Sequence, residues 1–177
     1  MIPKSGVRLS EEIMLKQKRW SPIPISSGWN RLRNRVLRPM TVRLRSHHLL
    51  CLLTYVGKGY SAAFVANYDV IAKRLGRGED ILIVSGPDDI CRPLLGEAEP
   101  HCLRESAAGR DELAARDVGK LLARPIEAGV RLSLDAATLA ALRAAFSAGV
   151  TREACQGCEW AGLCSTIAAG GYRDVRL

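Results

Sequence analysis

Three cysteines late in the chain have the residue type and the spacing of a site that holds a metal. Cys155, Cys158 and Cys164 form a C-x2-C-x5-C run within ten residues. Three thiolates on one short turn and helix start can converge on one centre, whereas cysteines that serve only as small apolar residues are scattered through core helices. Six cysteines in 177 residues are too few for a disulfide scaffold. The run therefore predicts a site for a metal ion or an iron–sulfur cluster.

The spacing of this run favours an iron–sulfur cluster over zinc. Structural zinc sites usually combine two pairs of closely spaced ligands, but the run offers one Cys-x2-Cys pair and a third cysteine at a longer step. Iron–sulfur clusters take four thiolates, often three from a compact run and one from elsewhere. We expect a [4Fe–4S] cluster for electron transfer, redox sensing or structural stapling, with Trp160 as a candidate contact around the ligands. A zinc-stabilised interaction module without a redox role is the alternative.

The fourth ligand must come from Cys51, Cys91 or Cys102. Cys91 follows a predicted strand and a Gly-Pro-Asp-Asp turn, and a loop cysteine can reach a site without distorting a helix. Cys102 lies in a less defined stretch rich in Pro, Gly and Glu. Cys51 lies in a leucine-rich segment, where a cysteine is usually a small buried apolar residue. We therefore expect Cys91 as the fourth ligand, ahead of Cys102 and Cys51.

Two histidines and two aspartates could add chemistry near the metal. His47 and His48 precede Cys51 by one helical turn, so the three side chains can share a helix face, and the histidines can contact the site. An enzyme that uses Asp88 and Asp89 with these histidines as acid–base groups is a third class of function. A turn followed by a helix cap explains the two aspartates without any catalytic role.

The elements that must position these residues are mainly helices. Apolar residues recur at helical spacing over 46–57, 61–76, 110–122 and 135–149, and a short helix runs through Ile167. Ser46, Ser61 and Asp135 are the predicted N-caps. Short β-branched or alternating runs at 81–84 and 131–134 predict two strands that can pair. The expected class is mainly α with a minor two-stranded β element (α+β). One stripe of predicted core residues is Phe64, Tyr68, Ile71 and Leu75.

Four runs of this sequence resemble one protein family. They are LRSHHLLCLL at 44–53, GKGYS at 57–61, GPDDIC at 86–91 and CQGCEW at 155–160. The family is one of small bacterial and archaeal proteins of unknown function that have been suggested to bind an iron–sulfur cluster. The resemblance covers residues 42–177 and implies a cluster but no reaction. Some members have a further Cys-Pro where this chain has Leu94. In this chain the C-terminal run is therefore favoured over that loop as the site of a cluster.

Most of the net charge of +8 lies in the first forty residues. They contain nine Lys or Arg against two Glu, a net charge of +7, so the other 137 residues carry +1. We expect residues 1–40 to be a disordered basic extension, with Met40 as the true start and residues 41–177 as a single domain. Binding of nucleic-acid phosphates by the extension is the alternative. The longest apolar stretch, 49–56, is too short to span a membrane, and we expect a cytoplasmic protein with an unidentified redox partner.

Overall fold

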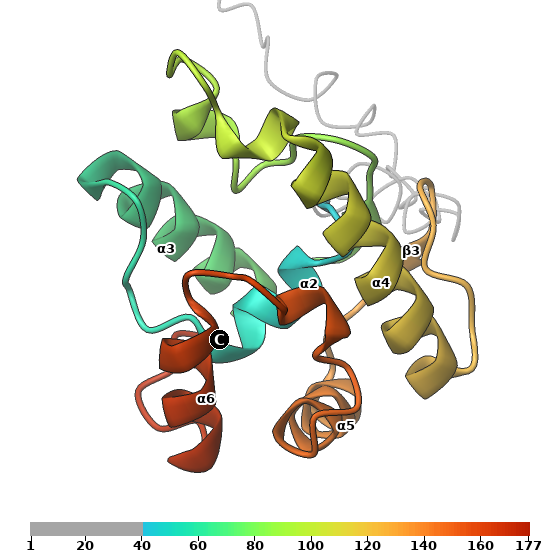
Figure 1. Ribbon diagram of the computed structural model, residues 1–177. Helices are drawn as coiled ribbons and strands as arrows, with labels where there is room; N and C mark the ends of the chain where they lie inside the picture. Colours follow the sequence, from blue (N-terminus) through green and yellow to red (C-terminus); the bar gives the residue numbers. More distant parts are fainter. Residues whose placement is uncertain (1–40) are drawn as a thin grey trace, which may run out of the picture. The chain divides into compact units, whose positions relative to one another are not determined.

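The structure, a computed structural model, describes residues 41–177 (Figure 1). Within this range, five α-helices and a three-stranded sheet form a mostly helical α+β fold, so the expected class is confirmed. The expected basic extension over residues 1–40, with its boundary at Met40, lies outside the described residues.

The sheet contains one strand more than the sequence predicts. β1 (Val42–Leu44) pairs in parallel with β2 (Ile81–Ile83), and β3 (Arg131–Leu132) pairs with the other edge of β2 in antiparallel orientation. β2 and β3 are the two predicted strands, and they pair as expected. β1 is not predicted, although Val42, Arg43 and Leu44 alternate between buried and exposed as in a strand. The expectation of two strands is corrected to three within residues 41–177.

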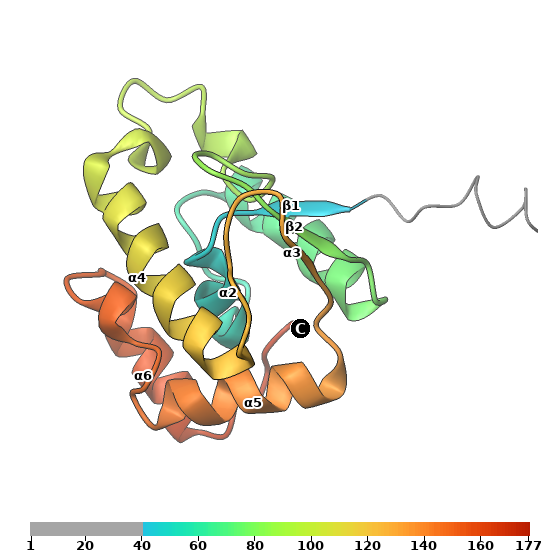
Figure 2. The same cartoon turned by 90° about the vertical axis from the view of Figure 1, so that its right-hand side faces the viewer.

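The parallel pairing of β1 and β2 requires a crossover, which α3 (Ala62–Gly76) supplies. The Ser61 hydroxyl accepts a hydrogen bond from the Phe64 N–H at 3.1 Å, as predicted for an N-cap. Figure 2 shows α3 beside β1 and β2. Its predicted apolar stripe is buried in the core: Phe64, Tyr68, Ile71 and Leu75.

Three further helices complete the fold: α4 (Glu105–Leu122), α5 (Ala136–Ser147) and α6 (Ala161–Ala169). α4 begins five residues before its predicted start at Arg110. The Asp135 carboxylate accepts the Thr138 N–H at 2.7 Å, so the predicted cap of α5 is present. The loops contain three 3-10 turns: η2 (Arg92–Leu94), η3 (His101–Leu103) and η4 (Glu153–Cys155). Over the range that the structure describes, no helix is long and apolar enough to cross a membrane.

The leucine-rich segment after β1 is shorter and tighter than the predicted helix over 46–57. α2 (His48–Cys51) continues into the 3-10 turn η1 (Leu52–Thr54), and Tyr55 is already extended. Its start also lacks a local side-chain cap, so the expected role of Ser46 is not observed. The Asp111 carboxylate of α4 instead accepts the N–H of His47 at 3.2 Å. A long-range contact thus replaces the local cap.

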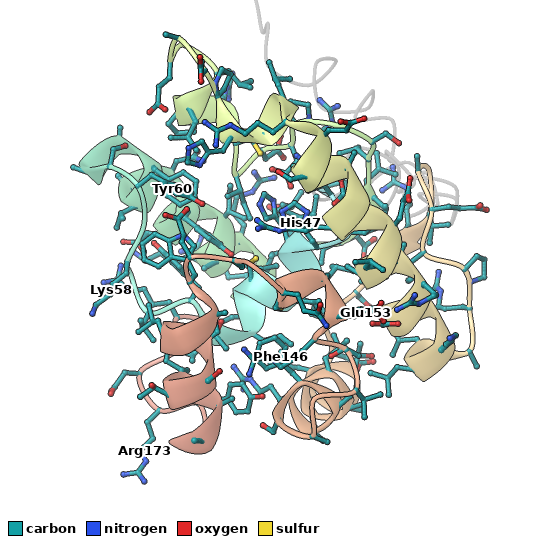
Figure 3. All side chains as sticks on the ribbon, viewed as in Figure 1. His47, Lys58, Tyr60, Phe146, Glu153 and Arg173 are labelled. Atoms are coloured by element: carbon teal, nitrogen blue, oxygen red, sulfur yellow. The ribbon has the colours of Figure 1, made fainter. Side chains whose placement is uncertain are left out.

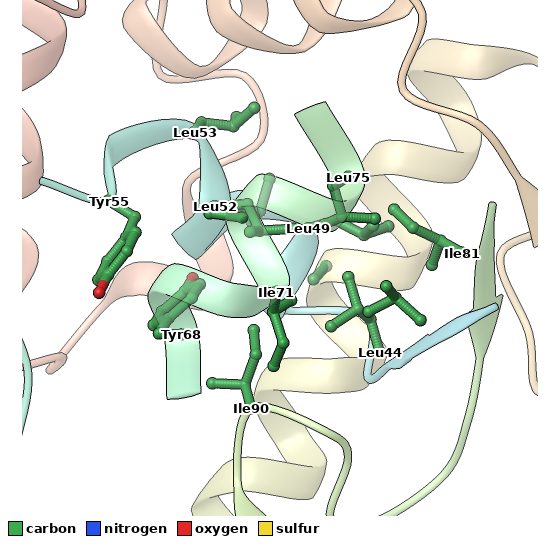
Figure 4. Close-up of a cluster of buried hydrophobic side chains, with 14 of the residues drawn as sticks. Leu44, Leu49, Leu52, Leu53, Tyr55, Tyr68, Ile71, Leu75, Ile81 and Ile90 are labelled. Atoms are coloured by element: carbon green, nitrogen blue, oxygen red, sulfur yellow. The ribbon is translucent and has the colours of Figure 1, made fainter. Parts of the chain in front are cut away.

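Buried leucines and isoleucines surround this short helix (Figure 4). They come from β1, α2, α3, β2 and the loop after β2, and most have no more than 3% of their surface exposed. Burial of such side chains is the main stabilising contribution to the fold. Because α2 lies within this core, Cys51 at its end is held on a fixed element. The labelled members include Leu44, Leu49, Leu52, Ile71, Leu75, Ile81 and Ile90.

Candidate functional site

Four cysteines from distant parts of the chain line one pocket. Cys51 lies at the end of α2, and Cys155, Cys158 and Cys164 lie between η4 and α6. Together they line a cavity of about 130 Å³. We call these four residues the thiol quartet and the cavity the thiol pocket. Figure 3 labels four other residues of its wall: His47, Lys58, Tyr60 and Phe146.

The backbone of the C-terminal run brings its three thiols together. η4 ends at Cys155, and Gly157 follows with a φ of 65°, a left-handed conformation that glycine adopts without strain. The Cys158 N–H then donates to the Cys155 carbonyl at 3.1 Å. The Cys164 N–H donates to the Trp160 carbonyl at 2.9 Å as α6 begins. The structure therefore places the three cysteines of the run at one pocket, as their spacing predicts.

The thiols of the quartet lie close enough to oppose one another's ionisation. Burial raises the pKa of Cys51 well above its usual value, and the other three thiols raise it further. Burial also raises the pKa of Cys155 and of Cys164, although Arg152 and a hydrogen bond from Thr54 act against it. A bound cation offsets such repulsion, because metal coordination deprotonates thiols. The quartet is therefore suited to hold a positively charged centre.

The sulfurs of the quartet are too far apart for a single zinc ion. Among residues 41–177, the one group of three His, Cys, Asp or Glu whose ligand atoms all lie within 4.8 Å is His48, Asp88 and Cys91. No three sulfurs of the quartet meet that limit. A tetrahedral ion with Zn–S bonds of ~2.3 Å places its sulfurs about 3.8 Å apart. The thiol pocket thus has room between its thiols for a centre larger than one ion.

Thr54 and Tyr68 line the thiol pocket, and their hydroxyl groups differ in what they meet. The Thr54 hydroxyl donates to the Cys164 sulfur at 3.1 Å. The Tyr68 hydroxyl is buried, and the described residues offer it no hydrogen-bond partner. The sequence predicts Tyr68 only as a core residue and assigns no contact to Thr54. Helical spacing says which face is buried, but it does not say which atom a hydroxyl meets.

The imidazoles of His47 and His48 form another part of the pocket wall. His47 Nδ1 lies 2.8 Å from an Asp111 oxygen, and His48 Nδ1 lies 2.6 Å from an Asp88 oxygen. Burial lowers the pKa of His47 to about 4, so this ring is neutral at pH 7. The Nδ1 atom of each ring is hydrogen-bonded to a carboxylate. Nε2 is therefore the ring nitrogen that remains to contact a group in the pocket. The sequence gives no sign of Asp111, which lies on α4, far along the chain.

Both oxygens of the Asp88 carboxylate are hydrogen-bonded to groups within the protein. One oxygen accepts the N–H groups of Ile90 and Cys91 at 2.9 and 3.1 Å, and the other accepts those of Arg45 and His48 Nδ1 at 2.8 and 2.6 Å. Burial alone would raise the pKa of Asp88, but His48 and the backbone donors lower it to about 2. A carboxylate with four hydrogen bonds has no free lone pair for a metal. The group of His48, Asp88 and Cys91 is therefore a filled hydrogen-bond network.

The remaining candidates lie away from the quartet. Cys91 and Cys102 are buried beside each other, and neither lines the thiol pocket. Burial and the Asp88 carboxylate raise the pKa of Cys91, so its thiol resists ionisation. Asp89 accepts the backbone N–H of Arg43 at 2.8 Å and so holds β1. The structure brings Cys51 to the C-terminal run, and it does not bring Cys91 there.

Aromatic rings lie at one side of the pocket. Tyr60 makes edge-to-face contacts with Trp160, His101 and Phe64, at ring distances of 5.6, 5.1 and 5.3 Å. Tyr60 keeps 42% of its surface exposed. Trp160 lines the pocket, so the structure places this expected contact residue beside the thiols. Tyr60, Phe64 and Trp160 thus form an aromatic part of the pocket wall.

The fold and the site define a small α+β protein with a four-thiol pocket. The chain belongs to the family described as "Protein of unknown function (DUF1284)", whose model matches residues 59–164. The matched range includes every cysteine of this chain except Cys51. No curated protein and no solved structure matches the chain.

Proposed function

We propose that this protein binds an iron–sulfur cluster of the [4Fe–4S] type through Cys51, Cys155, Cys158 and Cys164. The observation that carries the proposal is that these four thiols line one pocket. Iron–sulfur clusters are held by four thiolates. When bound, the cluster supplies one-electron redox chemistry or a structural link between elements.

The residues present fit such a group. The sulfurs are more widely spaced than one zinc ion requires, which suits a centre with several metal atoms. The Tyr68 hydroxyl is a buried donor without an acceptor among residues 41–177, and a cluster carries sulfide acceptors. Arg110 and Arg152 add positive charge near thiolates that would otherwise repel each other.

The proposal takes Cys51 as the fourth ligand in place of Cys91. Cys51 is the cysteine outside the C-terminal run that lines the thiol pocket. Cys91 lies with Cys102 in the network around Asp88. The preference for a loop residue assumed that a helical cysteine is only a packing residue, but Cys51 is only partly buried and lines the thiol pocket.

Metal analysis of the protein purified without oxygen tests this proposal. We expect iron and acid-labile sulfide in equal amounts, about four of each per chain, and a brown solution that bleaches on reduction. Zinc at one ion per chain without sulfide would contradict the proposal and favour the zinc-stabilised module. The cysteines are free in this structure, which suits a reducing compartment, and we propose that the protein works in the cytoplasm with a redox partner.

The anchored imidazoles favour an enzyme as a second candidate function. His47 and His48 face the same pocket as the quartet, and each is held by an ionised carboxylate, an arrangement common where imidazole nitrogens act on ligands. Carbethoxylation of histidine tests it, followed by peptide mass mapping. A substrate should protect His47 and His48, but not the exposed His101, which serves as the internal control. Equal modification of all three with every small molecule tried would contradict this candidate.

A further inference from the structure

Two stacked tyrosines differ in what their hydroxyls meet. The rings of Tyr55 and Tyr68 lie 3.8 Å apart with an interplanar angle of 12°, and each residue is 4% exposed. The Tyr55 hydroxyl donates to Asp69 at 2.8 Å and also lies 3.0 Å from the Val65 carbonyl. The Tyr68 hydroxyl is buried and finds no partner in the described part of the chain. An unpaired buried hydroxyl is unfavourable, so this difference calls for an acceptor.

The acceptor must lie on the side of the thiol pocket. Tyr68 lines that pocket. Burial raises the pKa of Tyr68, and the ionisable groups near it are Cys51, Asp88, Tyr55 and Cys164. Asp88 cannot be the acceptor, because its two oxygens already take four hydrogen bonds. On the pocket side are the thiols of the quartet, and a group bound to them would place further sulfur atoms there.

We propose that Tyr68 donates a hydrogen bond to a sulfur atom of the group held by the quartet, and so raises the reduction potential of that group. This inference rests on the proposed function. Reduction adds negative charge to the sulfurs, and a hydrogen-bond donor stabilises the reduced form more than the oxidised form. Tyr68 is thus a positioning and tuning residue and not a ligand.

The matched pair of variants Tyr68→Phe and Tyr55→Phe tests the inference. Each removes one hydroxyl and leaves its ring in the stack. Tyr68→Phe removes no hydrogen bond within residues 41–177, so the variant keeps the hydrogen bonds that hold the fold. The midpoint potential is measured by anaerobic redox titration of the iron-loaded proteins, together with iron and sulfide per chain.

We expect Tyr68→Phe to keep its iron and to have a lower midpoint potential than the wild type. Tyr55→Phe should keep the wild-type potential, although it loses the bond to Asp69 and unfolds at a lower temperature. A wild-type potential in Tyr68→Phe would overturn the inference, and so would equal shifts in the two variants. If the wild-type protein contains no iron or sulfide, the proposed function itself fails, and the iron analysis shows this before any potential is measured.

Discussion

Two polar regions meet at His47 and His48, and they differ in how completely their groups are paired. In one, Arg45 donates to Asp111 and to the Cys102 carbonyl, and Asp88 accepts four hydrogen bonds. In the other, four thiols and Tyr68, whose hydroxyl is unpaired within residues 41–177, line a cavity. A region whose polar groups are all paired holds the fold, whereas a region with unpaired donors and spare ligands is suited to bind something. We call the first region the carboxylate corner.

The six cysteines also divide between these two regions. Cys91 and Cys102 belong to the carboxylate corner, and the quartet belongs to the thiol pocket. Burial separates the two sets, because Cys91 is 3% and Cys102 8% exposed while the quartet is only partly buried. Their surroundings also differ: backbone and carboxylate partners in one case and other thiols in the other. The comparison predicts opposite results for the two sets.

The largest expected effect is the loss of bound iron in Cys51→Ser. A serine hydroxyl is a poor substitute for one of four thiolate ligands, so the variant should lose the cluster. Cys91→Ser is the control, because it changes a buried cysteine that does not line the thiol pocket, and it should keep its iron. Iron and sulfide per chain after anaerobic purification measure both. Loss of iron from Cys91→Ser with full iron in Cys51→Ser would reverse the comparison and restore Cys91 as the fourth ligand.

A large effect on stability is expected from Asp88→Asn. The asparagine NH2 group cannot accept hydrogen bonds, so two of the four donors around this side chain lose their acceptor, at roughly 1–3 kcal/mol for each buried group. We expect the free energy of unfolding in urea to fall by about 3 kcal/mol. Asp89→Asn is the control, since Asp89 holds a single backbone N–H at the edge of the sheet, and it should lose much less. Similar losses of unfolding free energy in the two variants would show that the carboxylate corner contributes no more to stability than a single hydrogen bond at the sheet edge.

The same carboxylate predicts how stability depends on pH. The pKa of Asp88 is about 2 in the folded protein and about 3.9 in an unfolded chain. Its contribution is therefore complete above pH 4 and is lost as the pH falls from about 4 to 2, with a total of ~2–3 kcal/mol. The measurement is the difference in unfolding free energy between wild type and Asp88→Asn at pH 7 and at pH 3. A difference that does not shrink at pH 3 would contradict this assignment.

The smallest effect is expected from Ser61→Ala, which serves as the reference for destabilisation without loss of a ligand. Ser61→Ala removes the hydroxyl that caps α3, and loss of an N-cap costs about 1 kcal/mol. The variant should melt at a lower temperature and keep all its iron, because Ser61 lies in neither region. It shows how much destabilisation the loaded pocket tolerates. If Ser61→Ala also loses iron, loss of iron in Cys51→Ser no longer identifies a ligand.

Local patterns predict much of this fold. The caps at Ser61 and Asp135 and the stripe of α3 are confirmed because each depends on residues a few positions apart. The strand Val42–Leu44 and the early start of α4 are not predicted. The first directly precedes the leucine-rich helical segment, and the second begins in residues without an apolar stripe. The cap of α2 fails for another reason, since its partner, Asp111, is 64 positions away.

Only the part of the site formed by residues close in sequence can be predicted. The spacing of Cys155, Cys158 and Cys164 indicates that they share a centre, and the structure places them at one pocket. The partnership with Cys51 depends on how the turn η1, which continues α2, packs against α6, and no spacing in the sequence reveals this. The unpaired hydroxyl of Tyr68 is invisible for the same reason. Chemistry that depends on contacts between distant elements requires the structure.

The Thr54–Cys164 hydrogen bond joins residues 110 positions apart, and this has a consequence for biosynthesis. On the ribosome, Cys51 emerges long before Cys164 is made. α2 is four residues long, and a helix of that length is not stable alone. The two sides of the pocket therefore meet only after Cys164 has left the exit tunnel. Whatever occupies the pocket must be delivered after most of the chain has been translated, so a delivery factor should recognise an almost finished protein and not a nascent one.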